Sequence, residues 1–159
     1  MKSSGENQFS VAVIIGSKSD EEIMQSCLRY LDHFGISSEV KVLSAHRNPE
    51  GLRQYVSRLE NHGTQLIIAA AGMAAHLPGV IASQTTLPVI GVPLSASELN
   101  GLDALLSMVQ MPTGIPVATV AIGKAGACNA AVLAAEILAV NSPEIQNKLS
   151  AFRAEGSKL

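Results

Sequence analysis

Aromatic and charged side chains are both scarce in this sequence. Its 159 residues include no Trp, two Tyr and three Phe, and charged residues make up only 15% whereas hydrophobic residues reach 47%. A chain of this length can form one domain with a hydrophobic core, which here must be built from aliphatic side chains. The low charge further predicts that some apolar surface is buried between subunits, the alternative being a monomer with an ordinary core.

The charge and cysteine content exclude several classes of protein. A net charge of -2 offers no basic face for nucleic acid. The two cysteines, Cys27 and Cys128, lack the spacing of a metal site or a disulfide framework, so we expect buried free thiols in a reducing compartment. Residues 1–10 contain no apolar signal segment, and polar residues interrupt the most apolar stretch, 115–140. We therefore expect a cytoplasmic protein without nucleic-acid or membrane partners.

Short β-type runs recur along the chain and indicate the fold. Four of them are almost continuously apolar, as strands buried on both faces of a parallel sheet are, and the run at 39–43 alternates as an edge strand does. The predicted strands are residues 11–15, 39–43, 66–71, 89–92 and 117–122. Helical patterns separate them, which predicts a doubly wound α/β fold with helices on both faces of a five-stranded parallel sheet. For that class we expect the flavodoxin-like (Rossmann-like) strand order 2-1-3-4-5.

The helices are indicated by apolar residues at helical spacing and by residues typical of helix starts. Ser19 and Glu22 have the spacing of a capping box, and Asn48 precedes Pro49 as an N-cap precedes a first-turn proline. The predicted helices cover residues 23–34, 49–59, 76–84, 102–109, 125–140 and about 143–155. Because no linker interrupts this series, we expect a single catalytic domain over 1–159, with its core at about 11–140 and a C-terminal helix at about 143–155.

Polar and titratable residues follow the strands at the edge where such sheets bind ligands. The strand-to-helix turn at 16–20 can hold a phosphate through backbone N–H groups and serine hydroxyls, although it matches neither dinucleotide nor ATP loop motifs. Asp20 either complements the helix dipole or binds sugar hydroxyls. At the next strand end, Arg47 can grip a phosphate with help from Ser44 or lie on the surface as a solvated cation.

Two of the four histidines lie at this same edge. His46 and His76 follow different strands, and together they favour proton transfer or ligand hydrogen bonding over metal binding. We interpret His33 and His62, on a helix and in a turn, as structural or surface residues. The residues alone thus predict an α/β enzyme that binds a small anionic ligand and uses histidine for acid–base chemistry.

Several motifs together resemble the N5-carboxyaminoimidazole ribonucleotide mutase family of de novo purine synthesis. The resemblance extends over about residues 11–140 and preserves the order and spacing of the motifs. They are GSKSD at 16–20, SAHRNP at 44–49, AAHLPG at 74–79, MPTGIPV at 111–117 and AIGKAG at 121–126. The resemblance implies a three-layer α/β/α sandwich and a homo-octamer whose active sites are shared between subunits. It also implies an isomerase that forms 4-carboxy-5-aminoimidazole ribonucleotide without a metal or organic cofactor.

The resemblance also assigns roles to individual residues. His46 corresponds to the general acid/base, while Ser17, Asp20 and Arg47 correspond to substrate-binding residues, with Ser19 and Ser44 assisting at the phosphate. The remaining predicted substrate-binding residues form the wall of the pocket near the migrating carboxylate. They are Gly72, Ala74, Ala75, His76 and Leu77. In such a pocket CO2 released from the substrate carbamate is held against the nucleophilic ring carbon, and one histidine serves both proton transfers.

Two alternative functions stay open, and the sequence departs from the family's usual residues at two positions. A related branch is a carboxylase of aminoimidazole ribonucleotide (AIR) that uses free CO2 and tends to carry lysine after the histidine, whereas this chain has Arg47. A non-enzymatic phosphate- or nucleotide-binding module is the other alternative. Many family members have glycine where this chain has Met73 and Ala70, which leaves open whether the backbone approaches the ligand closely at position 73.

Overall fold

A five-stranded parallel sheet forms the centre of the molecule. The computed structural model describes residues 9–159, so residues 1–8, where we expected no signal segment, lie outside the described residues. The strand order is β2-β1-β3-β4-β5, and every neighbouring pair is parallel, which confirms the flavodoxin-like order. The strands are β1 (Val11–Ile15), β2 (Ser38–Val42), β3 (Leu66–Gly72), β4 (Val89–Leu94) and β5 (Ala118–Thr119).

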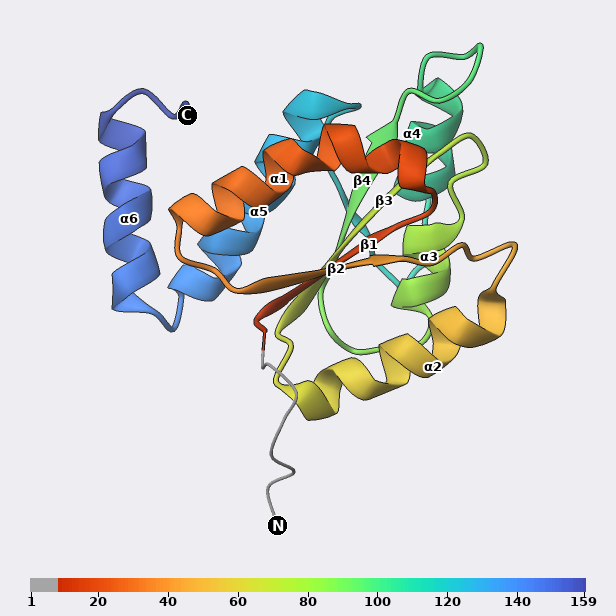
Figure 1. Cartoon of the computed structure of the whole chain (residues 1–159), viewed down its shortest axis with the longest axis horizontal. Helices are drawn as coiled ribbons and strands as arrows, with labels where there is room; N and C mark the ends of the chain where they lie inside the picture. The colour runs from red at the N-terminus through yellow and green to blue at the C-terminus, as the bar shows by residue number, and fades with distance from the viewer. Residues whose placement is uncertain (1–8) are drawn as a thin grey trace.

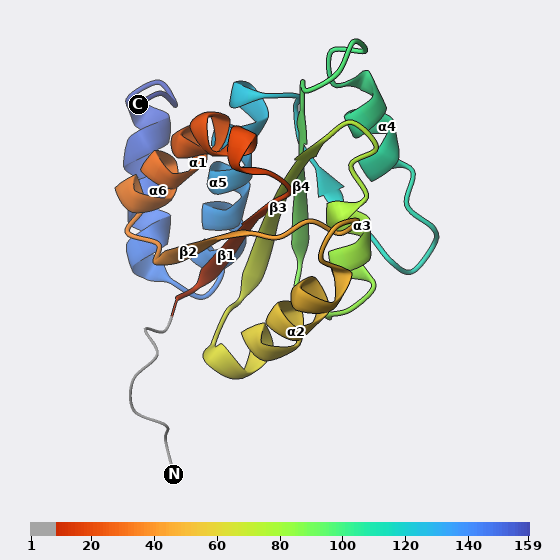
Figure 2. The ribbon, with the colours of Figure 1, turned by 45° about the vertical axis from the view of Figure 1, so that its right-hand side comes forward.

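Helices cover both faces of this sheet and complete three layers. Figures 1 and 2 show α1 and α5 on one side of the sheet and α2 and α3 on the other, with α6 outside α1 and α5. All the predicted helices are present, in the predicted order. They are α1 (Glu21–His33), α2 (Pro49–Leu59), α3 (Leu77–Ala82), α4 (Leu102–Val109), α5 (Lys124–Ala139) and α6 (Pro143–Ala154). Two short 3-10 turns, η1 (Lys18–Asp20) and η2 (Glu60–His62), flank α1 and α2.

The side chains of β1 point alternately to the two faces of the sheet, so this one strand contributes to two hydrophobic cores. Val11, Val13 and Ile15 belong to the core that includes residues of α1, α5 and α6, while Ala12 and Ile14 belong to the core that includes residues of α2, α3 and α4. All five side chains are fully buried. Side chains of a strand point alternately to the two faces of its sheet, so a strand covered on both faces must be apolar throughout. This is the physical basis of the continuous apolar run at 11–15.

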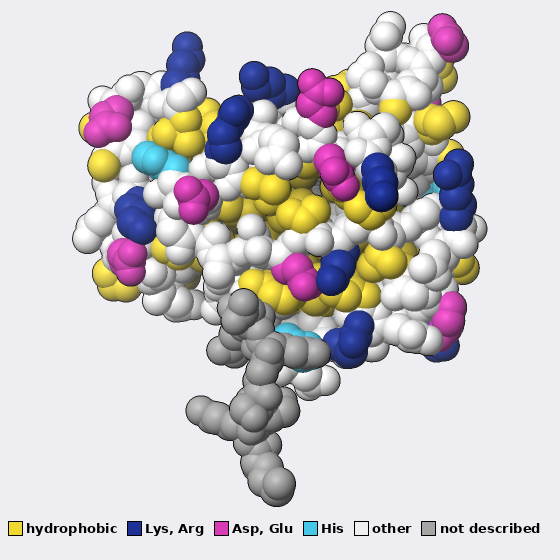
Figure 3. Space-filling model, viewed as in Figure 1, with side chains coloured by type: hydrophobic (Ala, Val, Ile, Leu, Met, Phe, Trp, Pro, Cys, Tyr) yellow, Lys and Arg dark blue, Asp and Glu magenta, His cyan; other side chains and the backbone are white. Residues whose placement is uncertain are grey.

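The two outer strands behave differently from the central ones. The predicted edge strand is confirmed, because β2 pairs only with β1 and its residues alternate between exposed and half-buried. Figure 3 shows hydrophobic surface in the middle of the face on which Figure 1 draws β2. On β2 itself, Val40 and Val42 are exposed. The prediction of a long buried strand at 117–122 was wrong. β5 has only two residues, because it forms the other edge of the sheet and little of the chain covers it.

Three of the five Phe and Tyr residues gather where α6 meets α1. Phe152 stacks edge-to-face with Phe34 at 5.3 Å and with Tyr30 at 5.9 Å between ring centroids. Lys148 on α6 donates a hydrogen bond to the Phe34 carbonyl at the end of α1. Figure 1 shows that α6 lies on the side of the molecule away from α3, where the candidate site is found, so in a single chain it does not cover that site.

Both cysteines are free, as predicted, but only one is fully buried. Cys27 on α1 is buried, whereas Cys128 on α5 is partly exposed. Burial, reinforced by the nearby Cys128, raises the pKa of the Cys27 thiol to about 12. The Cys27 thiol therefore stays protonated at neutral pH and behaves as a small apolar side chain.

Within residues 9–159, no helix has both the length and the apolar character needed to span a bilayer.

Candidate active site

A cleft of about 390 Å³ opens at the carboxyl ends of β1, β2 and β3. This is the switch point of the sheet, where the chain leaves β1 for β2 on one side and later returns to β3 on the other. The structure brings all eleven predicted site residues to this cleft. They are Ser17, Ser19, Asp20, Ser44, His46, Arg47, Gly72, Ala74, Ala75, His76 and Leu77.

The turn after β1 forms one side of the cleft through a closed set of hydrogen bonds. The Ser17 hydroxyl accepts a hydrogen bond from the Ser19 N–H, and the Asp20 carboxylate accepts one from the Ser17 N–H at 3.0 Å. These two bonds make a capping box on η1. The prediction that Ser19 and Glu22 form the box was wrong, because a 3-10 turn precedes α1 and moves the capping residues two positions earlier.

Burial sets the electrostatics of Asp20. The residue is only 6% exposed, and loss of solvent raises the pKa of its carboxyl group above the usual value, an effect opposed by hydrogen bonds from the Ser17 N–H and the Ser19 hydroxyl. A buried carboxylate repels a phosphate and attracts hydroxyl donors. Asp20 itself is therefore better suited to bind sugar hydroxyls than a phosphate, which would need the serine hydroxyls together with a cation.

The opposite side of the cleft carries the two histidines, which are in direct contact. His46 Nε2 lies 2.6 Å from His76 Nδ1, and the rings meet edge-to-face. One nitrogen must donate and the other accept, so this hydrogen bond couples the tautomers of the two rings. The segment after β2 supplies His46, and His76 stands at the start of α3. Both rings are exposed to the cleft, so a proton held between them is accessible to a ligand.

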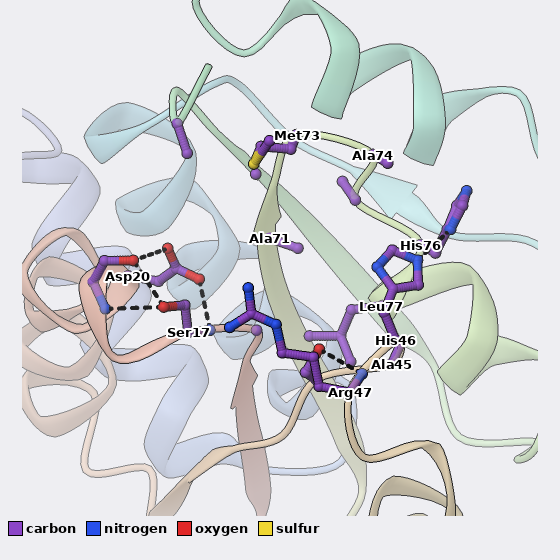
Figure 4. Close-up of a pocket in the computed structure, with 16 residues that line it drawn as sticks. Ser17, Asp20, Ala45, His46, Arg47, Ala71, Met73, Ala74, His76 and Leu77 are labelled. Atoms are coloured by element: carbon purple, nitrogen blue, oxygen red, sulfur yellow. Dashed lines mark hydrogen bonds between the residues drawn. The ribbon is translucent and has the colours of Figure 1, made fainter.

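Arg47 supplies the positive charge of the cleft. Its backbone N–H donates to the Ser44 hydroxyl at 3.2 Å, which fixes the turn after β2. Among the residues that the structure describes, no carboxylate pairs with its guanidinium group. Figure 4 shows the Arg47 side chain directed toward the side of the cleft formed by Ser17 and Asp20. An exposed guanidinium beside serine hydroxyls can bind a phosphate bidentately.

Small and apolar residues after β3 form the floor and upper rim of the cleft. Ala75 and Leu77 are buried beneath it, while Ala74 is exposed to it. A Cβ atom on Gly72 would lie 2.5 Å from the Ala96 Cβ atom, so glycine is required where β3 approaches the segment after β4. Met73 lies at the rim with its side chain 60% exposed.

Five residues that line the cleft were not predicted as site residues. They are Gly16, Ala45, Ala71, Met73 and Ala96. Gly16 and Ala45 fall inside motifs whose other members we selected, and their lack of a functional group gave no reason to choose them. Ala96 follows β4, and only the strand order brings it beside Gly72. Sequence periodicity does not carry that information.

The described residues offer no obvious metal site. Among residues 9–159, no three His, Cys, Asp or Glu side chains are grouped closely enough to hold a metal ion. The polar groups that do converge are two imidazoles, one buried carboxylate, one guanidinium and several hydroxyls. This set can bind a phosphorylated sugar and move protons.

Fold and cleft together define a doubly wound α/β enzyme that carries its acid–base and anion-binding groups at the switch point of the sheet. Comparison with known proteins agrees and is more specific. A family model described as AIR carboxylase matches residues 10–158. The chain belongs to this AIR carboxylase family.

Within this family, the chain is similar to enzymes that are named as mutases. N5-carboxyaminoimidazole ribonucleotide mutase of Vibrio cholerae is 53% identical over 147 residues, which are 92% of this chain and 91% of that protein. The enzyme of the same name from Saccharolobus solfataricus is 56% identical over 89% of this chain and 89% of that protein. The one from Escherichia coli is 50% identical over 95% of this chain and 89% of that protein. The crystal structure of Treponema denticola PurE superposes with a TM-score of 0.84 at 27% identity, covering 92% of this chain and 90% of that one.

Proposed function

We propose that this chain is an isomerase that converts N5-carboxyaminoimidazole ribonucleotide to 4-carboxy-5-aminoimidazole ribonucleotide. Its similarity to mutases over about nine-tenths of the chain supports the reaction. The observation that carries the chemistry is the hydrogen-bonded pair of His46 and His76 in the cleft, because the reaction needs one proton delivered and one removed. We propose that one catalytic domain, working in the cytoplasm without a metal or organic cofactor, performs it.

The charges of the cleft suggest how the substrate is held. Arg47, with Ser44, Ser17 and Ser19, would bind the phosphate, and the buried carboxylate of Asp20 would accept hydrogen bonds from ribose hydroxyls. These contacts fix the imidazole ring between the histidine pair and the floor of the cleft. The small side chains of Ala74 and Ala75, with Gly72, leave room for the carboxyl group, and His76 and Leu77 complete the wall.

The chemistry then needs only proton transfer and enclosure. His46 protonates the carbamate nitrogen, the bond from nitrogen to the carboxyl carbon breaks with its electrons remaining on nitrogen, and CO2 is released. The ring carbon then attacks CO2, and His46 removes the proton from that carbon, which restores aromaticity. Holding CO2 against the ring replaces a dilute bimolecular encounter with a local one. His76 would set the tautomer of His46 between these two steps.

Replacement of His46 tests the acid–base role. We expect His46→Gln to lower kcat by at least about 100-fold while substrate affinity changes little, because glutamine keeps polarity but cannot exchange the proton. The matched control is His62→Gln, since His62 lies in η2 beyond the end of α2 and does not line the cleft. Full activity in His46→Gln would contradict the role and would favour a simple binding module.

An isotope experiment separates the mutase from the carboxylase of the same family. The purified protein is mixed with the carbamate substrate in labelled bicarbonate, and the label in the product is measured over a single turnover. We expect product with little label, because the carboxyl group stays in the cleft. Rapid incorporation, or turnover of AIR with dissolved CO2, would instead assign the chain to the carboxylase branch.

We further propose that the protein works as a homo-octamer whose active sites are shared between subunits. The support is an apolar face that a single chain leaves uncovered. On α4, Leu102, Leu106 and Val109 are each about half exposed, and Ile115 is exposed in the segment that follows. Exposed apolar residues on neighbouring helical turns are typical of a subunit contact. The Met111 side chain lies against Gly79 on α3, so this face is continuous with the helix that His76 caps.

A further inference from the structure

A strained residue stands at the rim of the cleft. Met73 has a φ of +55°, in the left-handed region that side-chain-bearing residues seldom adopt. The Ala75 N–H donates to the Gly72 carbonyl at 3.1 Å, so Met73 is the first central residue of a four-residue turn. When only the first central residue of such a turn has a positive φ, that position strongly prefers glycine.

The backbone next to this turn is closely packed. Gly72 lies against the segment after β4, where an added Cβ atom would meet Ala96 at 2.5 Å and the Leu94 carbonyl at 3.2 Å. Position 72 therefore has no room for a side chain, and the close packing there leaves little space for a shift that would relax position 73. Glycine at 73 would satisfy the turn without strain. A backbone outlier that a simple substitution would relieve suggests that the side chain is retained for function.

The position of the Met73 side chain indicates what that function is. It is 60% exposed and belongs to neither hydrophobic core, so it adds little to folding stability. It nevertheless lines the cleft, at the end of β3 and on the rim opposite Arg47 (Figure 4). A methionine side chain is long, apolar and flexible enough to fold over a bound ligand.

We propose that Met73 closes the apolar side of the cleft over the migrating carboxyl group and retains released CO2 until it is recaptured. This inference rests on the proposed mutase function. After the carbamate bond breaks, CO2 either forms the new bond to the ring carbon, with loss of the ring proton to His46, or escapes and leaves AIR behind. Ala71, Ala74 and Ala75 border the same space but are too short to cover it. The Met73 side chain is longer and can extend over this space.

The test compares the fate of CO2 in matched variants of the full chain. Met73→Gly removes the side chain and also relieves the backbone strain, so the protein should be at least as stable as the wild type. We expect its ratio of AIR to rearranged product to rise at least fivefold, with a comparable rise in labelled bicarbonate incorporated during one turnover. Met73→Leu, which keeps an apolar side chain of similar size, should restore most of the retention.

Asn100 provides the control for the change in backbone. It also has a positive φ, +51°, is exposed, and does not line the cleft. Asn100→Gly should therefore leave the ratio at the wild-type value. An unchanged ratio in Met73→Gly would overturn the proposal, as would a Met73→Gly protein of smaller mass by light scattering, which would make Met73 a subunit contact. A wild-type protein that forms no rearranged product would instead contradict the proposed function itself.

Discussion

The carboxylate of Asp20 illustrates a conflict between stability and binding at a single residue. It is buried, and the loss of solvent raises its pKa, so ionised Asp20 opposes folding. Because the folded-state pKa lies above the unfolded one, this cost is absent below the unfolded pKa, near 4. The cost grows as the pH rises from the unfolded-state pKa to the folded-state pKa, and it is constant above the folded-state pKa. At neutral pH the folded protein therefore bears a cost that a functional role would explain.

Substitution of Asp20 by asparagine should separate these two effects. We expect Asp20→Asn to be as stable as the wild type or more stable at pH 7, by up to about 1 kcal/mol, and to lose that advantage near pH 3. If Asp20 binds ribose hydroxyls, substrate affinity should fall at least about tenfold. Thermal melts of both proteins at the two pH values measure the first effect, and titration with substrate measures the second. A stability difference independent of pH would show that desolvation of the charge is not its cause.

Residue types in the cleft could be predicted from the sequence, but their conformations could not. His46, His76 and Arg47 were predicted because titratable and charged residues at strand ends mark a ligand site. The hydrogen bond between the two histidines depends on how β2 and β3 are placed on either side of β1. The positive φ of Met73 likewise occurs in a turn next to Gly72, where β3 lies close to the segment after β4. Such tertiary constraints leave no local pattern in the sequence.

At the scale of elements, continuous apolar runs predicted strands well where both faces are covered. β1, β3 and β4 lie inside the sheet and are buried over almost their whole lengths. The apolar run at 117–122 was predicted in the same way, yet β5 is a two-residue edge strand. An apolar run indicates that a segment is buried, but it does not show whether residues of the same chain or of another subunit bury it. The helix starts show the same limit, since the 3-10 turn before α1 displaced the predicted capping box.

The attachment of α6 provides a prediction at this scale. Phe152 is 2% exposed and packs against Phe34 and Tyr30, so Phe152→Ala should lower the free energy of unfolding by about 3 kcal/mol. Because α6 lies away from the cleft of its own chain, kcat at a temperature well below the melting transition should change little. Urea denaturation and steady-state assays measure the two effects. Val140→Ala, at a position 80% exposed beyond the end of α5, is the control. A kcat that falls with stability would place α6 at a neighbouring subunit's site.

At the scale of the whole molecule, the apolar residues divide into two sets. One set fills the two cores on either side of the sheet, and the described chain buries it completely. Much of the other set lies exposed on α4 and at the β2 edge, toward opposite ends of the sheet, while single apolar residues such as Val140 are exposed elsewhere. The composition, with 47% hydrophobic and 15% charged residues, is explained only when both sets are counted. The proposed assembly of several copies would bury the second set as the fold buries the first.

Leu106 distinguishes an assembled protein from a monomer. Its side chain is 56% exposed in a single chain, so a charge there should alter the stability of a monomer by no more than about 0.5 kcal/mol. If a second copy covers α4, Leu106→Glu would instead bury an unpaired charge, and the assembly should dissociate. Light scattering should then show a smaller particle, circular dichroism an intact fold, and assays a large loss of activity, because we propose that the sites are shared between subunits. Val140→Glu introduces the same charge at another exposed apolar position and should leave the mass unchanged. A Leu106→Glu protein of wild-type mass and activity would mean that α4 faces solvent, and that the apolar excess of this sequence has another cause.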